Sequence, residues 1–175
     1  MKGLVHIYAG DGKGKTTAAL GLGMRACGSG IKVLMVQFLK SMDTGEKVVI
    51  DRLLPDFRLY RGKLATKFTW DMLPEELEDL KAEVREMFRY AKDDALEGRC
   101  NLLILDEILG CIAGGFISMK EITDFIKSKP DDLEVVLTGR NAPEELIELA
   151  DYVSEVKAIK HPYQRGIPAR KGIEF

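Results

Sequence analysis

A glycine-rich segment near the N-terminus has the residue types and spacing of a phosphate-binding loop. It reads Ala-Gly-Asp-Gly-Lys-Gly-Lys-Thr over residues 9–16, between an apolar run and a helical pattern. Glycines let backbone N–H groups surround phosphate oxygens, and the start of the following helix adds positive potential. Lys15 can neutralise phosphate charge, and the Thr16 hydroxyl can ligate Mg²⁺. The sequence therefore predicts a P-loop for a nucleoside triphosphate with magnesium, although Ala9 replaces the usual first glycine.

Some alternatives stay open within this loop. Lys13 is either a second phosphate contact or a solvated lysine. Asp11 would repel phosphates, so we expect it to meet ribose hydroxyls or to cap the helix. A plain glycine-rich turn is the alternative for the whole segment, and the strand-to-helix context disfavours it. The predicted nucleotide-binding residues here are Gly10, Asp11, Gly12, Lys13, Gly14, Lys15, Thr16 and Thr17.

An acidic pair follows the fully apolar run Leu102–Leu105. Asp106 and Glu107 at that point are typical of a Walker B strand, which brings a carboxylate across from the P-loop, where magnesium is held. An incidental acidic pair at a strand end is the alternative. The predicted magnesium ligands are Thr16, Asp106 and Glu107.

Two further polar residues follow strand-like runs and would emerge at the same edge of a parallel sheet. Gln37 is either part of the nucleotide site or a satisfied loop amide. Arg140 either pairs with phosphates or forms a surface ion pair. We take both as candidate ATP-binding residues.

Short apolar runs alternate with helical patterns along the chain. Strands are predicted at Leu4–Tyr8, Val33–Phe38, Phe57–Tyr60, Leu102–Leu105, Leu133–Leu137 and Tyr152–Val156. Helices are predicted at Lys15–Cys27, from Pro74 to a stop at Gly98, at Met119–Lys127 and at Pro143–Leu149. Ser41–Asp51 and Arg61–Asp71 are predicted loops. This alternation predicts an α/β fold of the P-loop NTPase-like (RecA-like) kind, a mostly parallel sheet with helices on both faces. Ligands of such sheets bind beyond the carboxyl ends of the strands.

Length and composition indicate one domain. The chain has 175 residues, so we expect a single P-loop domain over 1–175 that ends in a basic tail at about 157–175. The 26 basic and 28 acidic residues give a net charge of −2, which gives no reason to expect a nucleic-acid partner. No signal peptide precedes the first strand and no apolar run approaches membrane-spanning length, so we expect a cytoplasmic protein with no membrane partner. The three cysteines are expected to be buried reduced thiols, with redox or metal roles as the alternative.

Several stretches together resemble the P-loop ATP:cob(I)alamin adenosyltransferases of the CobA/BtuR kind. They are Gly10–Ala19, Val36–Phe38 with Lys40, Phe68–Trp70, Leu105–Glu107, Leu137–Arg140 with Ala142-Pro143, Ala150-Asp151, Lys160–Tyr163 and Lys171–Phe175. They cover nearly the whole chain in the family's order. Three elements make the resemblance specific: Gly139-Arg140 with Ala142-Pro143, Lys160–Pro162 and Gly172–Phe175.

The resemblance implies transfer of the 5′-deoxyadenosyl group from ATP to Co(I) of a corrinoid, with release of triphosphate. It implies a nucleotide that lies reversed in the P-loop, so that C5′ faces the cobalt. Lys15, Thr16 and Glu107 become the catalytic candidates, because with Mg²⁺ they would stabilise the leaving triphosphate. Glu107 is the favoured magnesium ligand and Asp106 its support. A homodimer and a reductant protein such as a flavodoxin are also implied.

Phe68 and Trp70 match the aromatic residues that contact the lower corrin face in this family. Without the resemblance, core packing would be the simpler expectation for a single tryptophan. The family usually carries an N-terminal arm over the partner subunit's site, and few residues precede the first strand here. Its loop after Lys40 also differs at Ser41–Thr44, so contacts from either segment are not carried over.

Two other functions remain open from the residues alone. A P-loop phosphotransferase or ATPase would release ADP, and a nucleotide-binding regulator would bind ATP without turnover.

Overall fold

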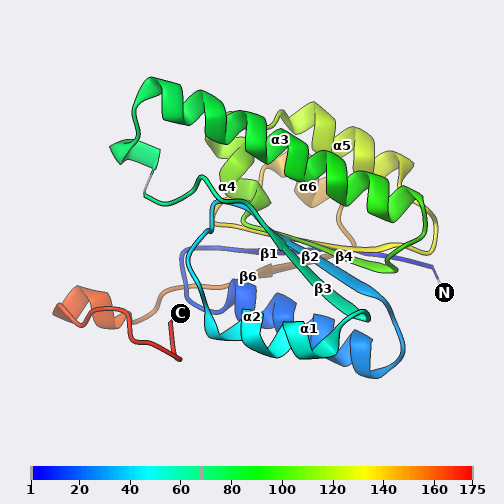
Figure 1. The fold of residues 1–175 in the computed structure, drawn as a ribbon, viewed down its shortest axis with the longest axis horizontal. Coiled ribbons are helices and arrows are strands. Elements are labelled where there is room, and N and C mark those ends of the chain that lie inside the picture. Colours follow the sequence, from blue (N-terminus) through cyan, green and yellow to red (C-terminus); the bar gives the residue numbers. More distant parts are fainter. Residues whose placement is uncertain (1, 68, 175) are drawn as a thin grey trace.

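A six-stranded parallel sheet forms the centre of the protein (Figure 1). The strands are β1 (Val5–Ala9), β2 (Val33–Gln37), β3 (Phe57–Arg61), β4 (Leu102–Asp106), β5 (Glu134–Thr138) and β6 (Tyr152–Glu155). Their order across the sheet is β3-β2-β4-β5-β1-β6, and each neighbouring pair is parallel. This computed structural model describes residues 2–67 and 69–174. The predicted α/β fold class is confirmed.

The sequence of each strand reflects its place in the sheet. Every residue of β2 and β4 is buried, and both strands are almost continuously apolar, as expected for strands covered on two faces. All four residues of β6 are exposed, because this strand lies at the edge and pairs only with β1 among the described strands.

Helices cover both faces of the sheet. They are α1 (Lys15–Gly28), α2 (Gly45–Ile50), α3 (Pro74–Leu96), α4 (Ile108–Ala113), α5 (Met119–Ser128) and α6 (Glu144–Leu149), with 3₁₀ turns at Asp51–Leu53, Thr69–Asp71 and Pro162–Arg165. Figure 1 shows α3, α4, α5 and α6 on one face and α1 and α2 on the other. A separate apolar core lies on each side of the sheet.

Close packing explains one of the small residues on α1. A Cβ atom on Gly23 would lie 2.8 Å from the ring of Phe57, so only glycine lets α1 approach β3 this closely.

Most predicted elements are present within one or two residues, and α3 begins at Pro74 as expected. The prediction of loop over Ser41–Asp51 was wrong, because this segment contains α2. Helix α4 was not predicted. Both helices have only six residues, which is too few to show a helical period in the sequence.

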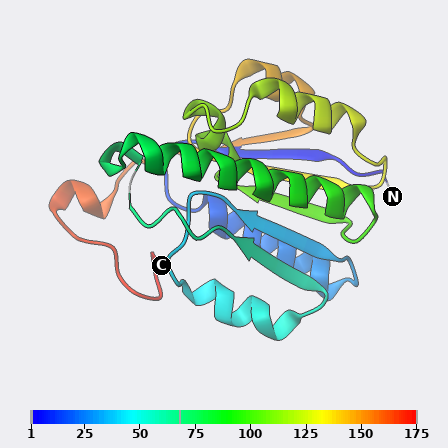
Figure 2. The ribbon, with the colours of Figure 1, turned by 45° about the horizontal axis from the view of Figure 1, so that its top comes forward.

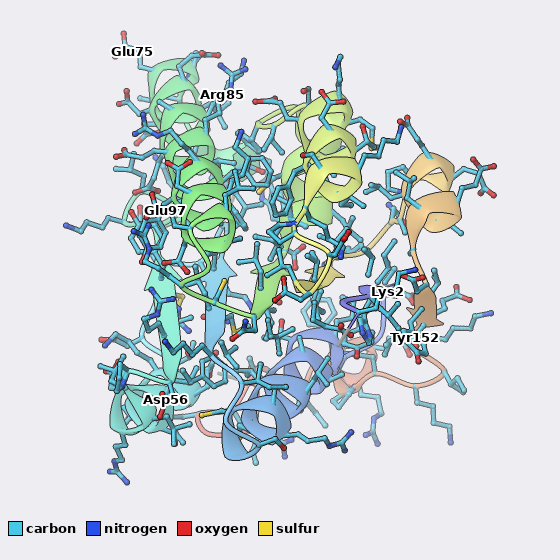
Figure 3. All side chains as sticks on the ribbon, turned by 90° about the vertical axis from the view of Figure 1, so that its right-hand side faces the viewer. Lys2, Asp56, Glu75, Arg85, Glu97 and Tyr152 are labelled. Carbon is cyan, nitrogen blue, oxygen red and sulfur yellow. The ribbon has the colours of Figure 1, made fainter. Side chains whose placement is uncertain are left out.

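A buried ion pair joins the end of α3 to the edge strand β3. The Arg58 guanidinium donates to both carboxylate oxygens of Asp94 at 2.8 and 2.7 Å, and Asp94 is 1% exposed. Figure 3 views the side of the molecule where the strands begin and labels Glu97 at this end of α3. The contact fixes one end of the longest helix to the sheet.

The C-terminal tail returns to the edge of the sheet where the strands end. Figures 1 and 2 both place it beside the beginning of α2.

Elsewhere, Cys100 and Cys111 are buried free thiols as predicted, whereas Cys27 is only half-buried. Among the described residues, no helix is both long and apolar enough to cross a membrane.

Candidate functional site

The glycine-rich loop turns sharply between β1 and α1. Gly10 and Gly14 have φ values of 118° and 122°, in the region that favours glycine. A Cβ atom on Gly10 would lie 2.3 Å from the carbonyl oxygen of Val156. The amide of Gly10 donates to the carbonyl of Arg140 at 2.7 Å, and that of Gly12 donates to Val156 at 2.8 Å. The first half of the loop is therefore anchored just beyond the ends of β5 and β6, where these two amides bond to backbone carbonyls. Nucleotide binding by Gly10 and Gly12 stays a prediction.

A pocket of about 610 Å³ opens beside the second half of the loop, at the carboxyl edge of the sheet. Its lining comes from the P-loop, the segment after β2, the segment before the Thr69–Asp71 turn, the end of β4 and the tail. The residues are Gly12, Lys13, Gly14, Lys15, Thr16, Thr17, Leu20, Leu39, Lys40, Ser41, Met42, Thr44, Gly45, Glu46, Ala65, Thr66, Lys67, Glu107, Gly172, Ile173 and Glu174. The volume is within the range of small-molecule and cofactor sites.

The Asp106 carboxylate, at the end of β4, is the centre of a buried hydrogen-bond network. Its Oδ1 accepts from the Thr16 hydroxyl at 2.8 Å and from the Thr138 hydroxyl at 2.7 Å. Its Oδ2 accepts from Gln37 Nε2 at 3.0 Å and from Lys40 Nζ at 2.7 Å. Four segments that are distant in sequence thus converge on one carboxylate.

Sheet order explains this convergence. Strand β5 lies between β4 and β1, so Thr138 at its end reaches Asp106 and also accepts from the amide of Glu107 at 2.9 Å. In the parallel register Gln37 lies directly opposite Asp106.

The Asp106 carboxylate is ionised although it is fully buried. Burial raises its pKa, but the Lys40 ammonium and the hydrogen bonds from Lys40, Thr138 and Thr16 outweigh that effect and hold the pKa below its usual value. A carboxylate and a hydroxyl 2.8 Å apart are hard oxygen donors of the kind that Mg²⁺ prefers. The described residues contain no cluster of three or more His, Cys, Asp or Glu side chains that could hold a metal ion, so a metal here would also need phosphate oxygens of the ligand beside Thr16 and Asp106 or Glu107.

Glu107 lines the same pocket with a left-handed backbone, φ 67°. Burial raises the pKa of its carboxyl, and the neighbouring Asp106 carboxylate adds to the shift. The resemblance favoured Glu107 over Asp106 as the magnesium ligand, whereas the residue hydrogen-bonded to Thr16 is Asp106. The choice of Glu107 stays a prediction.

Lys15 projects from the first turn of α1 into the pocket, and its Nζ donates to the carbonyl of Gly12 at 2.9 Å. Burial lowers the pKa of its ammonium, with an opposing effect from Glu107 and a further lowering by Arg140. Arg140 is exposed and forms no ion pair with any described residue, so the predicted surface ion pair is absent there.

Gln37 and Asp11 have structural partners. Gln37 is fully buried, and its Oε1 accepts from Arg61 Nε at 2.5 Å while its amide donates to Asp106. The satisfied-amide alternative therefore describes Gln37, which supports Asp106 from behind and lies outside the pocket lining given above. Asp11 accepts from the amide of Ala158 at 3.2 Å, and the cap of α1 is Gly14, so the expected helix-capping role of Asp11 was wrong.

Of the two aromatic candidates, the structure describes only Trp70. Phe68 lies outside the described residues. Trp70, in the turn Thr69–Asp71, is 76% exposed, so the core-packing alternative was wrong. The preceding residues Ala65, Thr66 and Lys67 line the pocket, which brings the turn to the same end of the molecule as the P-loop (Figure 1).

The sequence did not identify several residues of the site. Lys40 was noted as part of the resemblance but received no role, and it contacts both Thr16 and Asp106. The loop residues Ser41, Met42 and Thr44, the start of α2 and the tail residues Gly172–Glu174 also border the pocket. Lys13 pairs with Glu174 at 3.3 Å, so it is not a fully solvated lysine, and its contact with a phosphate stays a prediction. Thr138 could have been identified as a site residue from its place at a strand end, directly before a glycine.

Comparison with known proteins agrees with this arrangement. A profile described as ATP:corrinoid adenosyltransferase BtuR/CobO/CobP matches residues 1–175. The chain belongs to this family. It is 39% identical to a corrinoid adenosyltransferase of Sinorhizobium over 99% of this chain and 81% of the relative. It is 34% identical to that of Escherichia coli K12 and 30% identical to that of Salmonella typhimurium LT2, in each case over 99% of this chain and 86% of the relative.

Proposed function

We propose that this protein transfers the 5′-deoxyadenosyl group of ATP to the reduced cobalt of a corrinoid and releases triphosphate. The match of the ATP:corrinoid adenosyltransferase family to residues 1–175 carries the proposal. The site supports it, because a P-loop, a buried carboxylate and a pocket of about 610 Å³ meet at one sheet edge.

In this reaction the electron pair of Co(I) attacks C5′ of ATP. A cobalt–carbon bond forms, the bond between C5′ and the α-phosphate oxygen breaks, and the electron pair leaves with triphosphate. The role of the chain is to align C5′ with cobalt and to stabilise the negative charge of the leaving group.

The second half of the P-loop has the groups for this task. Gly14, Lys15, Thr16 and Thr17 line the pocket. Their backbone amides, with the Lys15 ammonium and the Thr16 hydroxyl, would hold the triphosphate, which in the proposed reversed orientation leaves the ribose toward the corrinoid. Thr16 with Asp106 or Glu107 would hold Mg²⁺, which supplies positive charge to the phosphates when bound. Arg140 is a further candidate cation at this edge.

Trp70 is proposed to contact the lower corrin face. The residue is 76% exposed, and it follows in sequence Ala65, Thr66 and Lys67, which border the pocket. Covering an exposed tryptophan with a large apolar ligand is favourable.

Three further assignments belong to the proposal by family resemblance. They are a homodimer, a reductant protein that supplies Co(I), and a cytoplasmic location. Light scattering in solution tests the first of these directly.

One turnover experiment separates the candidate functions. ATP, Mg²⁺ and chemically reduced cobalamin are incubated with the protein, and the products are followed by phosphorus NMR and by the visible spectrum of the corrinoid. We expect intact triphosphate and a new alkyl-cobalt spectrum in equal amounts. ADP and phosphate formed at the same rate without corrinoid would establish the phosphotransferase or ATPase alternative. Binding of ATP with no product would establish the regulator.

A further inference from the structure

Lys40 binds the same two oxygen-bearing side chains that would hold the metal. Its Nζ lies 2.7 Å from Asp106 Oδ2 and 3.1 Å from Thr16 Oγ1, and Thr16 itself donates to Asp106 Oδ1 at 2.8 Å. The ammonium therefore sits where a hydroxyl from the P-loop helix meets the carboxylate of β4. No residue pattern in the sequence identified this contact.

The other partners of Asp106 are held in place by further bonds. Gln37 is fully buried and bonded to Arg61, and Thr138 is fully buried and accepts from the amide of Glu107. These two groups can support Asp106 while a ligand approaches, but they cannot move away without breaking a second contact.

Lys40 differs from these partners in exposure and position. Its side chain is 32% exposed and lines the pocket, and it follows Leu39, whose φ of 53° turns the chain out of β2. The lysine stem has four rotatable bonds, so the ammonium can leave Asp106 and remain within the pocket. Apart from Thr16, which would stay as a metal ligand, Lys40 is thus the one described partner of Asp106 that can move without disturbing the sheet.

We propose that Lys40 is a resident counter-ion of Asp106 that a divalent cation must displace from Thr16 and Asp106, and that the displaced ammonium then pairs with the nucleotide's triphosphate. The proposal rests on the proposed function, since it takes Thr16 and Asp106 as the metal-binding pair of a P-loop. Two cations cannot share this pair without strong repulsion.

The displacement has a thermodynamic consequence. Without nucleotide, a divalent cation must separate the Lys40 ammonium from Asp106, its anionic partner, so the cation binds weakly. Triphosphate offers the ammonium a new partner, so nucleotide and metal each strengthen the binding of the other by the same factor. The protein would thereby favour the metal–nucleotide complex over either component alone.

The test measures Mn²⁺ binding by the loss of the free-ion EPR signal, with and without ATP, for wild type and for Lys40→Met and Lys40→Gln. Without ATP we expect both variants to bind Mn²⁺ about 5- to 100-fold more tightly than wild type. We also expect the enhancement of Mn²⁺ binding by ATP to shrink by a similar factor. Lys40→Arg keeps the charge and should bind Mn²⁺ as weakly as wild type.

A control and a second readout address folding. Lys47→Met removes an exposed lysine of α2 that pairs with Asp51, and it should leave Mn²⁺ binding unchanged. In thermal unfolding, Mn²⁺ without ATP should raise the unfolding temperature of Lys40→Met more than that of wild type. The glutamine variant can still donate one hydrogen bond to Asp106, so it keeps the test available if the methionine variant does not fold.

The outcomes separate this proposal from the proposed function. Folded Lys40 variants that bind Mn²⁺ no more tightly than wild type without ATP overturn the counter-ion role alone. Wild-type protein that binds Mn²⁺ no better with ATP than without overturns it together with the metal–nucleotide site. Failure of adenosyl transfer in the turnover experiment, with the Mn²⁺ results as expected, overturns only the proposed reaction.

Discussion

At the residue scale, the site depends on one buried carboxylate and the cations around it. Asp106 accepts four hydrogen bonds, and Lys40 and Lys15 both come from segments that line the pocket. Clustered ammonium groups repel one another unless an anion lies between them. A triphosphate supplies that anion, so the charge arrangement and the proposed ligand agree.

Lys15→Ala tests the phosphate contact. The Lys15 ammonium would stabilise the leaving triphosphate, so its loss should lower the rate by on the order of 10²–10⁴. The unfolding temperature should barely change, because the only hydrogen bond that the described residues give Lys15 Nζ is to the carbonyl of Gly12. The measurement is steady-state turnover with chemically reduced cobalamin, and Lys47→Ala is the matched control. Near-normal turnover of the folded variant would contradict a phosphate role for Lys15.

At the element scale, the contact between α3 and β3 is a stability prediction. Asp94→Asn leaves the Arg58 guanidinium without its anionic partner, so the free energy of unfolding should fall by roughly 3 kcal/mol. Urea unfolding at pH 7 measures this loss. Asp93→Asn is the control, because Asp93 is exposed one position away on the same helix and should change the value by under about 0.5 kcal/mol.

The same contact predicts a pH dependence. Burial raises the pKa of Asp94, but the hydrogen bonds and charge of Arg58, with help from Arg99, hold the pKa below its usual value. The stabilisation is therefore complete above the unfolded pKa, about 4, and is lost as pH falls through the lower folded value. Urea unfolding of wild type and Asp94→Asn should converge as the pH is lowered below about 4. A difference that stays constant down to pH 2 would show that ionisation of Asp94 does not matter.

The turn Thr69–Asp71 gives a second prediction at this scale. Co(II) in a free corrinoid keeps an axial ligand that makes its reduction unfavourable, and an apolar side chain over the lower face would exclude that ligand. Trp70→Ala should therefore slow adenosylation that starts from Co(II) much more than adenosylation that starts from Co(I). ATP affinity should stay nearly the same, because the P-loop is unchanged. Tyr163→Ala, which removes another exposed aromatic ring, is the control, and equal losses from both cobalt states would contradict the corrin contact.

At the scale of the whole molecule, the tail closes one side of the pocket. Glu174 pairs with Lys13 across 161 positions of sequence. Hydrogen bonds from Arg170 lower the pKa of the Glu174 carboxyl to about 2, so it is charged at neutral pH. A carboxylate that pairs with the Lys13 ammonium would compete with a phosphate for the same positive charge.

Glu174→Gln should therefore tighten ATP binding. We expect a few-fold lower dissociation constant by calorimetry at low salt and a smaller gain at high salt, since the pair is partly exposed. Glu155→Gln, which removes an exposed carboxylate paired with Lys157, should have little effect. Weaker ATP binding by Glu174→Gln would instead mean that the tail supports the nucleotide.

The sequence by itself determined the fold class and most element positions, and it predicted the phosphate-binding character of the site. Each of these depends on local pattern. Apolar runs specify buried strands, Pro74 begins a helix, and the glycine and lysine spacing of residues 9–16 predicts a P-loop. The family motifs spread along the chain indicated a particular reaction.

The tertiary structure decided which polar side chains share an environment. Strand order placed β5 between β4 and β1 and so brought Thr138 to Asp106, and the turn after β2 brought Lys40 to the same carboxylate. The tertiary structure also buried Gln37, whose amide donates to Asp106. It placed the Asp11 carboxylate against the amide of Ala158 and the Glu174 carboxylate against Lys13. These contacts join residues that are far apart in sequence, and their geometry follows from sheet packing. Local residue patterns carry no information about it.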